Sequence, residues 1–274
     1  ANRRRTRAAS SRHCRAVCGF PNGTDLGRRS GGVMIRKILD AREEERRETV
    51  AQQQGLLSKE ITKSVRLPYL LHLPEAYGKV ERKWPLIVFL HGSGERGDDP
   101  EKLKLHGIPK VVERDPSFPF VAVSPQCPEN SFWTAHLDSV TALIDDTIAQ
   151  YDVDPDRVYL TGLSMGGWGT WALAIAHPDR FAAIAPICGG ENPNRASTLK
   201  EVPVWAFHGA KDTVTPAHYS QAMVDALRRA GADVRFTLYE HADHDSWTET
   251  YDNPALYEWF LRHSLQSRKR EGGR

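Results

Sequence analysis

The chain has 274 residues, of which 40% are hydrophobic and 26% are charged, as in a soluble protein with one large α/β domain. Its net charge of +2 is uneven, because residues 1–33 hold eight arginines and one aspartate, and residues 268–274 hold four basic residues and one glutamate. The remaining residues are acidic, which excludes a nucleic-acid-binding domain, and no apolar run is long enough for a transmembrane helix.

The ends of the chain differ in composition from its middle. Residues 1–33 are rich in arginine, serine and glycine, show no periodicity and are expected to be disordered. Residues 34–54 carry dense charge of both signs, which favours a solvated helical segment. We expect one folded domain over residues 55–266, followed by a disordered basic tail over residues 267–274. The N-terminus lacks the apolar core of a secretory signal, so a cytoplasmic location is expected.

The basic head is expected to be dispensable, because its composition cannot support a packed core. Met34 is a plausible native start, with the residues before it derived from expression or from an over-extended reading frame. A chain that begins at Met34 should keep the melting temperature and the activity of the full chain. Thermal unfolding and steady-state kinetics test this, and a Tm several degrees lower after truncation would mean that the head packs on the folded domain.

From residue 55 onwards, apolar runs typical of strands alternate with helical patterns. Leu86–Leu90 is a continuous apolar run, as expected of a strand buried on both faces. The other expected strands are Leu56–Val65, Tyr69–Leu73, Phe120–Val123, Val158–Thr161, Ala182–Ile187, Val202–Phe207 and Val234–Tyr239. The expected helices are Leu103–Glu113, Ser139–Tyr151, Met165–His177, Pro216–Ala230 and Pro254–Ser264. This alternation predicts an α/β fold with a mostly parallel sheet of about eight strands, helices on both faces and an antiparallel pair of strands at one edge.

The expected strand Val158–Thr161 and the helix from Met165 enclose the pentapeptide GLSMG, residues 162–166. This is G-x-S-x-G between a strand and a helix, which is the context of a nucleophile elbow. The turn is too tight for a side chain two residues before or after the serine, and glycine removes the clash. Ser164 is therefore a candidate nucleophile, and the N–H of Met165 can stabilise an oxyanion. The alternative is a glycine-rich turn with an incidental serine.

Parallel α/β sheets carry their sites at the C-terminal ends of the strands, and two loops there hold further candidates. The loop HGSGERG follows Leu86–Leu90, and the N–H of Ser93 is the expected second oxyanion donor. Asp212 follows the expected strand Val202–Phe207, where it can orient a histidine and stabilise its imidazolium. Its alternative role is an N-cap of the next helix, although Thr215 is better placed for that.

The segment EHADHDSW after the last expected strand supplies the histidine. The order Ser164, Asp212, His244 matches the chain order of a Ser-Asp-His triad on an α/β sheet, and His241 is the rival base. The same histidines could instead bind a metal, but no third and fourth ligands recur with motif spacing, so we expect no metal and no cofactor. The remaining candidates, expected to be structural or to line a pocket, are His91, His106, His136 and His208.

The four cysteines give no metal or disulfide pattern. Cys14 and Cys18 have no downstream partners, so they are a poor zinc signal. Cys127 and Cys188 lie at the ends of two expected strands and are interpreted as free thiols, because a small buried hydrophobe is the commoner role.

Five stretches together are specific for one family: LHGSGERGDD, SPQCP, YLTGLSMGGWGTW, FHGAKDTVTP and HADHDSWTETYDNPALYEWFL. Through them the chain from about residue 55 to 264 resembles the α/β-hydrolase superfamily, and most closely the dienelactone-hydrolase and phospholipase/carboxylesterase-like serine esterases, a group that includes "predicted peptidases". The resemblance implies an α/β-hydrolase fold without a large cap domain. It also favours His244 over His241 as the base, and it matches the oxyanion loop at His91–Gly94.

The residues and the resemblance together predict a serine carboxylesterase that acts through an acyl-enzyme, with Ser164 as nucleophile. Only 13 residues, Gly189–Glu201, are available where lipases of this fold carry a cap, so short acyl chains are expected. Trp133 and Trp168 are candidate pocket walls or ordinary core residues. The alternatives are a feruloyl or acetyl-xylan esterase, a serine peptidase, and a non-catalytic binding protein of the same fold. The expected partner is a small ester, and the choice between monomer and homodimer stays open.

Overall fold

The computed structural model describes residues 54–60 and 62–271. The chain divides into two units, residues 1–62 and residues 63–274. The described residues of the first unit form no helix and no strand. The expected disordered head and nearly all of the expected charged helical segment, residues 1–53, lie outside the described residues.

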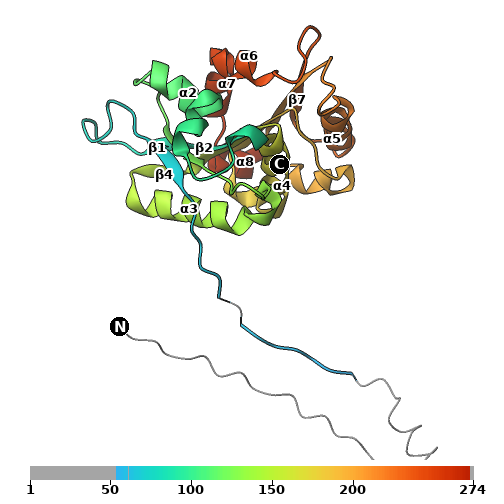
Figure 1. Ribbon diagram of the computed structural model, residues 1–274, viewed down its shortest axis with the longest axis horizontal. Coiled ribbons are helices and arrows are strands. Elements are labelled where there is room, and N and C mark those ends of the chain that lie inside the picture. The colour runs from blue at the N-terminus through green and yellow to red at the C-terminus, as the bar shows by residue number, and fades with distance from the viewer. Residues whose placement is uncertain (1–53, 61, 272–274) are drawn as a thin grey trace, which may run out of the picture. The chain divides into compact units, whose positions relative to one another are not determined.

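A seven-stranded sheet forms the centre of the second unit (Figure 1). In order across the sheet, the strands are β1 (Tyr69–His72), β3 (Val121–Pro125), β2 (Trp84–Leu90), β4 (Val153–Leu163), β5 (Ala183–Ile187), β6 (Val204–Gly209) and β7 (Val234–Tyr239). Strand β1 pairs antiparallel with β3, and every other neighbouring pair is parallel. The prediction of a mostly parallel α/β sheet is confirmed.

Helices cover both faces of this sheet (Figure 1). The described α-helices are α2 (Gly107–Arg114), α3 (Leu137–Gln150), α4 (Met165–Ala176), α5 (His218–Arg229), α6 (Trp247–Asp252), α7 (Pro254–Leu261) and α8 (Leu265–Glu271). The described 3-10 helices are η1 (Ser93–Glu95), η2 (Pro100–Leu105), η3 (Trp133–Ala135), η4 (Pro178–Arg180) and η5 (Pro193–Leu199). None of the described helices has the length and apolar character needed to cross a membrane.

Two apolar clusters, one on each face, hold the sheet between the helices. Alternate residues of β2 enter different clusters, Leu86 and Val88 in one and Ile87 and Phe89 in the other, as the two-residue period of a strand requires. Helices α3, α4 and α5 contribute to the first cluster, and α2, α6 and α7 contribute to the second. Every residue of β2, β3 and β5 is buried, which explains why these sequences are apolar except at Ser124 of β3.

The sheet has seven strands rather than about eight, because the expected strand Leu56–Val65 is not formed. These residues adopt no strand wherever they are described, and the Leu56 and Leu57 side chains are 94% and 88% exposed. Strand β1 is the edge of the sheet and pairs antiparallel with β3 instead. A suitable pattern does not make a strand unless the backbone finds a neighbour to pair with.

The expected helix Leu103–Glu113 is divided into η2 and α2 at His106, whose backbone is extended. Gly107 follows with φ of 63°, and a Cβ at this position would lie 2.2 Å from the Phe89 ring. The close approach of the backbone to this buried ring therefore requires glycine and interrupts the helix.

The expected disordered tail, residues 267–274, begins inside helix α8. Arg268 anchors this helix by donating from Nε to the Glu201 carbonyl oxygen at 2.7 Å. Its Nη1 donates to the carbonyl oxygens of Pro178 and Phe181 at 3.1 and 2.6 Å. A basic sequence near the chain end suggested a solvated tail, but hydrogen bonds to three distant carbonyls order its first part.

Candidate active site

Ser164 occupies the sharp turn between β4 and α4. Its backbone has φ of 51° and ψ of −116°, an uncommon combination for a residue with a side chain. A Cβ on Gly166 would lie 1.8 Å from the Leu90 carbonyl oxygen, and one on Gly162 would lie 2.5 Å from the Gly166 carbonyl oxygen. Glycine is therefore required on both sides of the serine, which is the close packing that G-x-S-x-G predicts.

Three side chains that follow β4, β6 and β7 meet beside this turn. His244 Nε2 lies 3.0 Å from Ser164 Oγ, and His244 Nδ1 lies 2.7 Å from Asp212 Oδ2. Both are hydrogen-bond distances, so one imidazole links the hydroxyl to the carboxylate. An ionised carboxylate can only accept, so Nδ1 carries a proton and a neutral His244 presents the lone pair of Nε2 to the serine hydroxyl.

Asp212 is held through both carboxylate oxygens. Its Oδ1 accepts hydrogen bonds from the N–H groups of Val214 at 2.9 Å and Thr215 at 2.8 Å, while Oδ2 faces the histidine. The carboxylate is fully buried, so these bonds fix its orientation. The expected capping role of Thr215 is wrong, because Thr215 belongs to the loop around Asp212. Helix α5 begins at His218 rather than at Pro216, and it has no side-chain cap.

The structure places His244, and not His241, beside the serine. The His241 side chain is 73% exposed, and its Nε2 lies 3.0 Å from the Glu249 carboxylate. The two histidines of the motif therefore have different partners. Within the described part of the chain, one group of three possible ligands is found, formed by Cys188, Asp212 and His244 with their ligand atoms within 4.8 Å of one another. It contains two members of the hydrogen-bonded triad.

The glycine-rich loop after β2 approaches the elbow closely. A Cβ on Gly92 would lie 2.8 Å from Leu163 Cδ1, so this loop packs on the residue before the serine. Arg96 Nε donates to the Ser93 carbonyl oxygen at 3.0 Å, which restrains the peptide that follows Ser93. Met165 begins α4, where the first N–H groups have no partner within the helix. The roles of the Ser93 and Met165 N–H groups as oxyanion donors stay predictions.

His91 anchors this loop from the protein interior. Its Nε2 accepts from the Cys127 N–H at 2.9 Å, so the ring proton is on Nδ1, which donates to the Gly92 carbonyl oxygen at 2.5 Å. Burial lowers the pKa of His91 to about 4, so the ring is neutral at pH 7. Trp133 Nε1 donates to the His91 carbonyl oxygen at 2.9 Å and completes the support.

The two tryptophans proposed as pocket walls have different positions. Trp133 is 1% exposed and packs within the core, so its interpretation as a pocket wall is corrected. The reason is close packing on α4, because a Cβ on Gly169 would lie 2.6 Å from Trp133 Cβ. Trp168 is half-buried at the start of α4, with its ring 5.1 Å from the Tyr219 ring, and it stays a candidate wall.

Cys188 contacts the nucleophile, a role that the sequence analysis missed. Its Sγ lies 3.2 Å from the Ser164 N–H, which donates to it, and its backbone has φ of 40°. Cys188 and Cys127 are both free and buried, as predicted. Burial raises the pKa of the Cys188 thiol to about 12, so it is protonated at pH 7. The one indication of this role in the sequence is that Cys188 directly follows β5, at the end of the sheet that carries the triad.

A series of polar and aromatic side chains, each in contact with the next, extends from the triad histidine through Trp247 of α6. The Trp247 ring meets His244 edge-on at 5.2 Å, and its Nε1 donates to His106 Nδ1 at 3.4 Å. The Glu95 carboxylate lies 3.9 Å from His106 and 3.8 Å from His91. Burial raises the pKa of Glu95. These residues come from three stretches of the chain, 91–95, 106 and 244–247, and only the fold brings the three stretches together.

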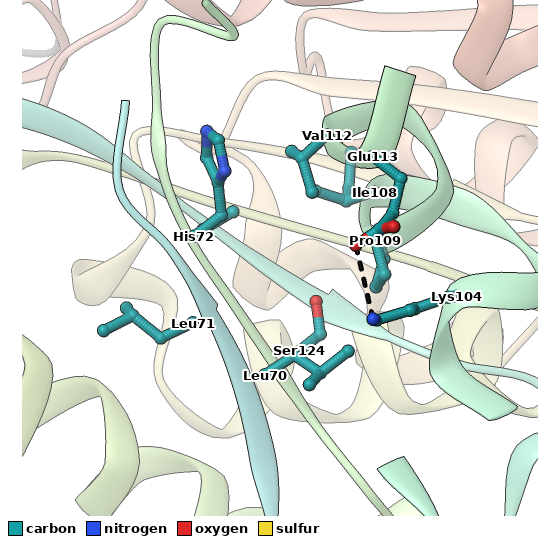
Figure 2. Close-up of a pocket in the computed structure, with 10 residues that line it drawn as sticks. Leu70, Leu71, His72, Lys104, Ile108, Pro109, Val112, Glu113 and Ser124 are labelled. Atoms are coloured by element: carbon teal, nitrogen blue, oxygen red, sulfur yellow. Dashed lines mark ion pairs between the residues drawn. The ribbon is translucent and has the colours of Figure 1, made fainter. Parts of the chain in front are cut away.

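A cavity of about 260 Å³ is formed elsewhere, by residues of β1, β3, η2 and α2 (Figure 2). Its lining includes Leu70, His72 and the ion pair between Lys104 Nζ and Glu113 Oε1, at 3.4 Å. No residue of the triad lines this cavity. We therefore locate the candidate active site by the geometry around Ser164 and not by the size of a cavity.

The fold and the site define a class of protein. A mostly parallel sheet with a serine elbow after β4, an acid after β6 and a histidine after β7 is the architecture of the α/β-hydrolase superfamily, whose esterases this chain matches in structure. Residues 126–258 match the dienelactone hydrolase family and form a domain of that family. The resemblance stated from the sequence motifs is confirmed.

Several relatives of this chain are named as esterases. A solved structure described as a thermostable esterase is 35% identical, with a TM-score of 0.64 over 74% of this chain and 60% of that chain. Carboxylesterase SOBER1 of Arabidopsis thaliana is 30% identical over 136 residues, 47% of this chain and 58% of that protein. The bifunctional acetylxylan esterase/xylanase XynS20E of Neocallimastix patriciarum is 31% identical over 183 residues, 64% of this chain and 26% of that protein. The chain spans about half the length, or less, of several curated relatives.

Proposed function

We propose that this chain is a serine carboxylesterase that hydrolyses short-acyl carboxylic esters with Ser164, His244 and Asp212. The observation that carries the proposal is the pair of contacts made by one imidazole, 3.0 Å to the serine hydroxyl and 2.7 Å to the carboxylate. This arrangement suits a hydroxyl nucleophile activated by an oriented general base. The esterase names of the relatives support the same class.

In the proposed acylation step, Ser164 Oγ attacks the ester carbonyl carbon and its proton passes to His244 Nε2. The Asp212 carboxylate stabilises the imidazolium that forms. The N–H groups of Ser93 and Met165 are the proposed donors to the carbonyl oxygen as it becomes an oxyanion. The tetrahedral intermediate then loses the alkoxide, which takes the proton from His244 and leaves as an alcohol, so the acyl group stays on Ser164.

In the proposed deacylation step, a water molecule takes the place of the alcohol. His244 Nε2 accepts a proton from the water as its oxygen attacks the acyl carbon. The second tetrahedral intermediate breaks its bond to Ser164 Oγ, which recovers the proton from His244. The carboxylic acid leaves, and the three side chains return to their starting protonation states.

A panel of esters and amides with matched acyl groups tests the proposed reaction class. We expect kcat/KM for the ester to exceed that for the matched amide at every acyl group. Amide cleavage at a comparable rate would instead favour a serine peptidase. No turnover of any substrate would favour a non-catalytic binding protein, whereas a strong preference for ferulate or acetyl-xylan esters would identify a subclass of the proposed esterase.

The segment between β5 and β6 supports the proposed acyl specificity. Its helix η5 packs against α4 and α5, and Ala196 and Leu199 of this helix are buried. This segment therefore lies on the body of the domain and supplies no apolar cover for a long acyl chain.

We expect activity on p-nitrophenyl esters to peak between acetate and butyrate and to fall steeply beyond hexanoate or octanoate. Each methylene left in water forgoes about 0.8 kcal/mol of burial, so longer chains gain nothing from an open site. No increase in rate should appear when the substrate passes its micelle concentration. Faster hydrolysis of the palmitate ester than of the butyrate ester would contradict this, and would mean that another segment encloses the acyl chain.

A further inference from the structure

A second histidine contacts the same oxygen of the triad carboxylate as His244. His208 lies in β6, and its side chain is fully buried. Its Nε2 lies 3.3 Å from Asp212 Oδ2 and 2.7 Å from the Thr215 carbonyl oxygen. Its Nδ1 lies 2.7 Å from Ser220 Oγ, which is itself 2.7 Å from the Gly189 carbonyl oxygen. The ring therefore belongs to a short hydrogen-bond network that is buried away from solvent.

The number of protons that this hydrogen-bond network requires fixes the charge of the His208 ring. Three contacts of 2.7 Å run from the Gly189 carbonyl through Ser220 Oγ and the His208 ring to the Thr215 carbonyl. Both carbonyl oxygens can only accept, so each contact requires its own proton. A neutral histidine and a serine hydroxyl supply two protons between them, whereas an imidazolium and the hydroxyl supply three. With a neutral ring, two lone pairs would face each other in a buried place, which is costly.

The surroundings of the ring act on its protonation in both directions. Burial is the largest effect and leaves the pKa of His208 lowered on balance, with the charge of His244 acting in the same direction, whereas the hydrogen bond to the Thr215 carbonyl and the charge of Asp212 raise it. The three short contacts require the charged ring against this effect of burial. The buried Asp212 carboxylate compensates the ring charge at 3.3 Å. The other titratable groups at this carboxylate are His244 and the Cys188 thiol from the end of β5, which is neutral at pH 7.

We propose that His208 is a buried imidazolium that shares the Asp212 carboxylate with His244, and thereby limits how readily His244 accepts a proton. The protonation state of His208 follows from contacts alone, while its effect on turnover rests on the proposed function. A second cation beside the same carboxylate opposes formation of the His244 imidazolium. It therefore keeps His244 neutral, and able to act as a base, at a lower pH than Asp212 alone would allow.

The protonation state can be measured without any substrate. In protein labelled with 15N-histidine, we expect both ring nitrogens of His208 to carry protons at pH 7, with the resonances assigned by their loss in His208→Asn. In Ser220→Ala, which removes the acceptor of Nδ1, the ring should lose that proton at a lower pH than in the parent chain. A His208 ring with one unprotonated nitrogen at pH 7 in the parent chain would overturn the proposal.

The effect on turnover is measured by the pH profile of kcat/KM for an acetate ester. In His208→Asn, the acid limb should move to higher pH by about one to two units, as expected for the loss of a unit charge a few ångströms away. A purely structural role predicts the opposite direction, because a displaced Asp212 would stabilise the His244 imidazolium less. An acid limb that stays in place or moves to lower pH would overturn the catalytic part of the proposal.

His241→Asn is the matched control, because His241 is exposed and pairs with Glu249. The acid limb of the kcat/KM profile of this variant should coincide with that of the parent chain. If His208→Asn does not fold, the His208 resonances are assigned by their shift in Ser220→Ala, which removes the partner of Nδ1, and the 15N measurement on the parent chain still decides the protonation state. An absence of ester turnover in the parent chain would contradict the proposed function and the effect on turnover, and the 15N result would stand separately.

Discussion

Ser164→Ala and His244→Ala are each expected to lower kcat for ester hydrolysis by about 10⁴ or more, with the fold intact. Ser164 supplies the attacking oxygen, and His244 Nε2, 3.0 Å away, is the only imidazole nitrogen that the described residues place on that oxygen. Because the two side chains act as a unit, the double variant should be about as slow as either single variant. Steady-state kinetics and circular dichroism measure the two properties separately.

His241→Ala is the control for this pair of variants. It removes a histidine of the same motif, but the side chain is exposed and bonded to Glu249, so kcat should change little. An inactive His241→Ala together with an active His244→Ala would mean that the base is wrongly assigned. Losses that multiply in the double variant would mean that serine and histidine do not act in one step.

Gly166→Ala is expected to lower the free energy of unfolding by about 3 kcal/mol or more, and to reduce kcat as the elbow is displaced. The added Cβ would lie 1.8 Å from the Leu90 carbonyl oxygen, which is backbone and cannot rotate away. The strand–helix turn must therefore open, and Ser164 moves with it. For a domain of this size, the corresponding decrease in Tm is about 6 to 12 °C.

Gly94→Ala is the matched control for stability. Gly94 is exposed, and a Cβ there would meet no atom within 4 Å. Its Tm should stay within about 2 °C of the parent chain, as for surface substitutions away from special backbone positions. Equal stability of Gly166→Ala and the parent chain in thermal unfolding would show that β4 and α4 are less closely packed than the structure indicates.

Much of the fold could be predicted because its signals are local. Continuous apolar runs such as Leu86–Leu90 identify strands that are buried on both faces, and they are found there. The tight turn at Ser164 requires glycine on both sides, so its position could be read from five residues. Asp212 and His244 could be placed at one end of the sheet because the C-terminal ends of parallel strands lie together.

The errors concern features that depend on distant partners. Leu56–Val65 has a suitable composition, but a strand also needs a paired neighbour. Trp133 follows a strand that ends at the site, yet its indole donates to the His91 carbonyl and packs in the core. The role of His208 depends on Ser220 and on backbone carbonyls from other loops, and no spacing in the sequence indicates these contacts.

The central claim is that Ser164 is the nucleophile, and covalent labelling tests it most directly. A fluorophosphonate that reacts with activated serines should add one equivalent to the parent chain, and peptide mass spectrometry should place the adduct on Ser164. Labelling should vanish in Ser164→Ala and should be strongly slowed in His244→Ala, which removes the base 3.0 Å from the hydroxyl. An adduct on another residue, or a parent chain that reacts no faster than Ser164→Ala, would contradict the account.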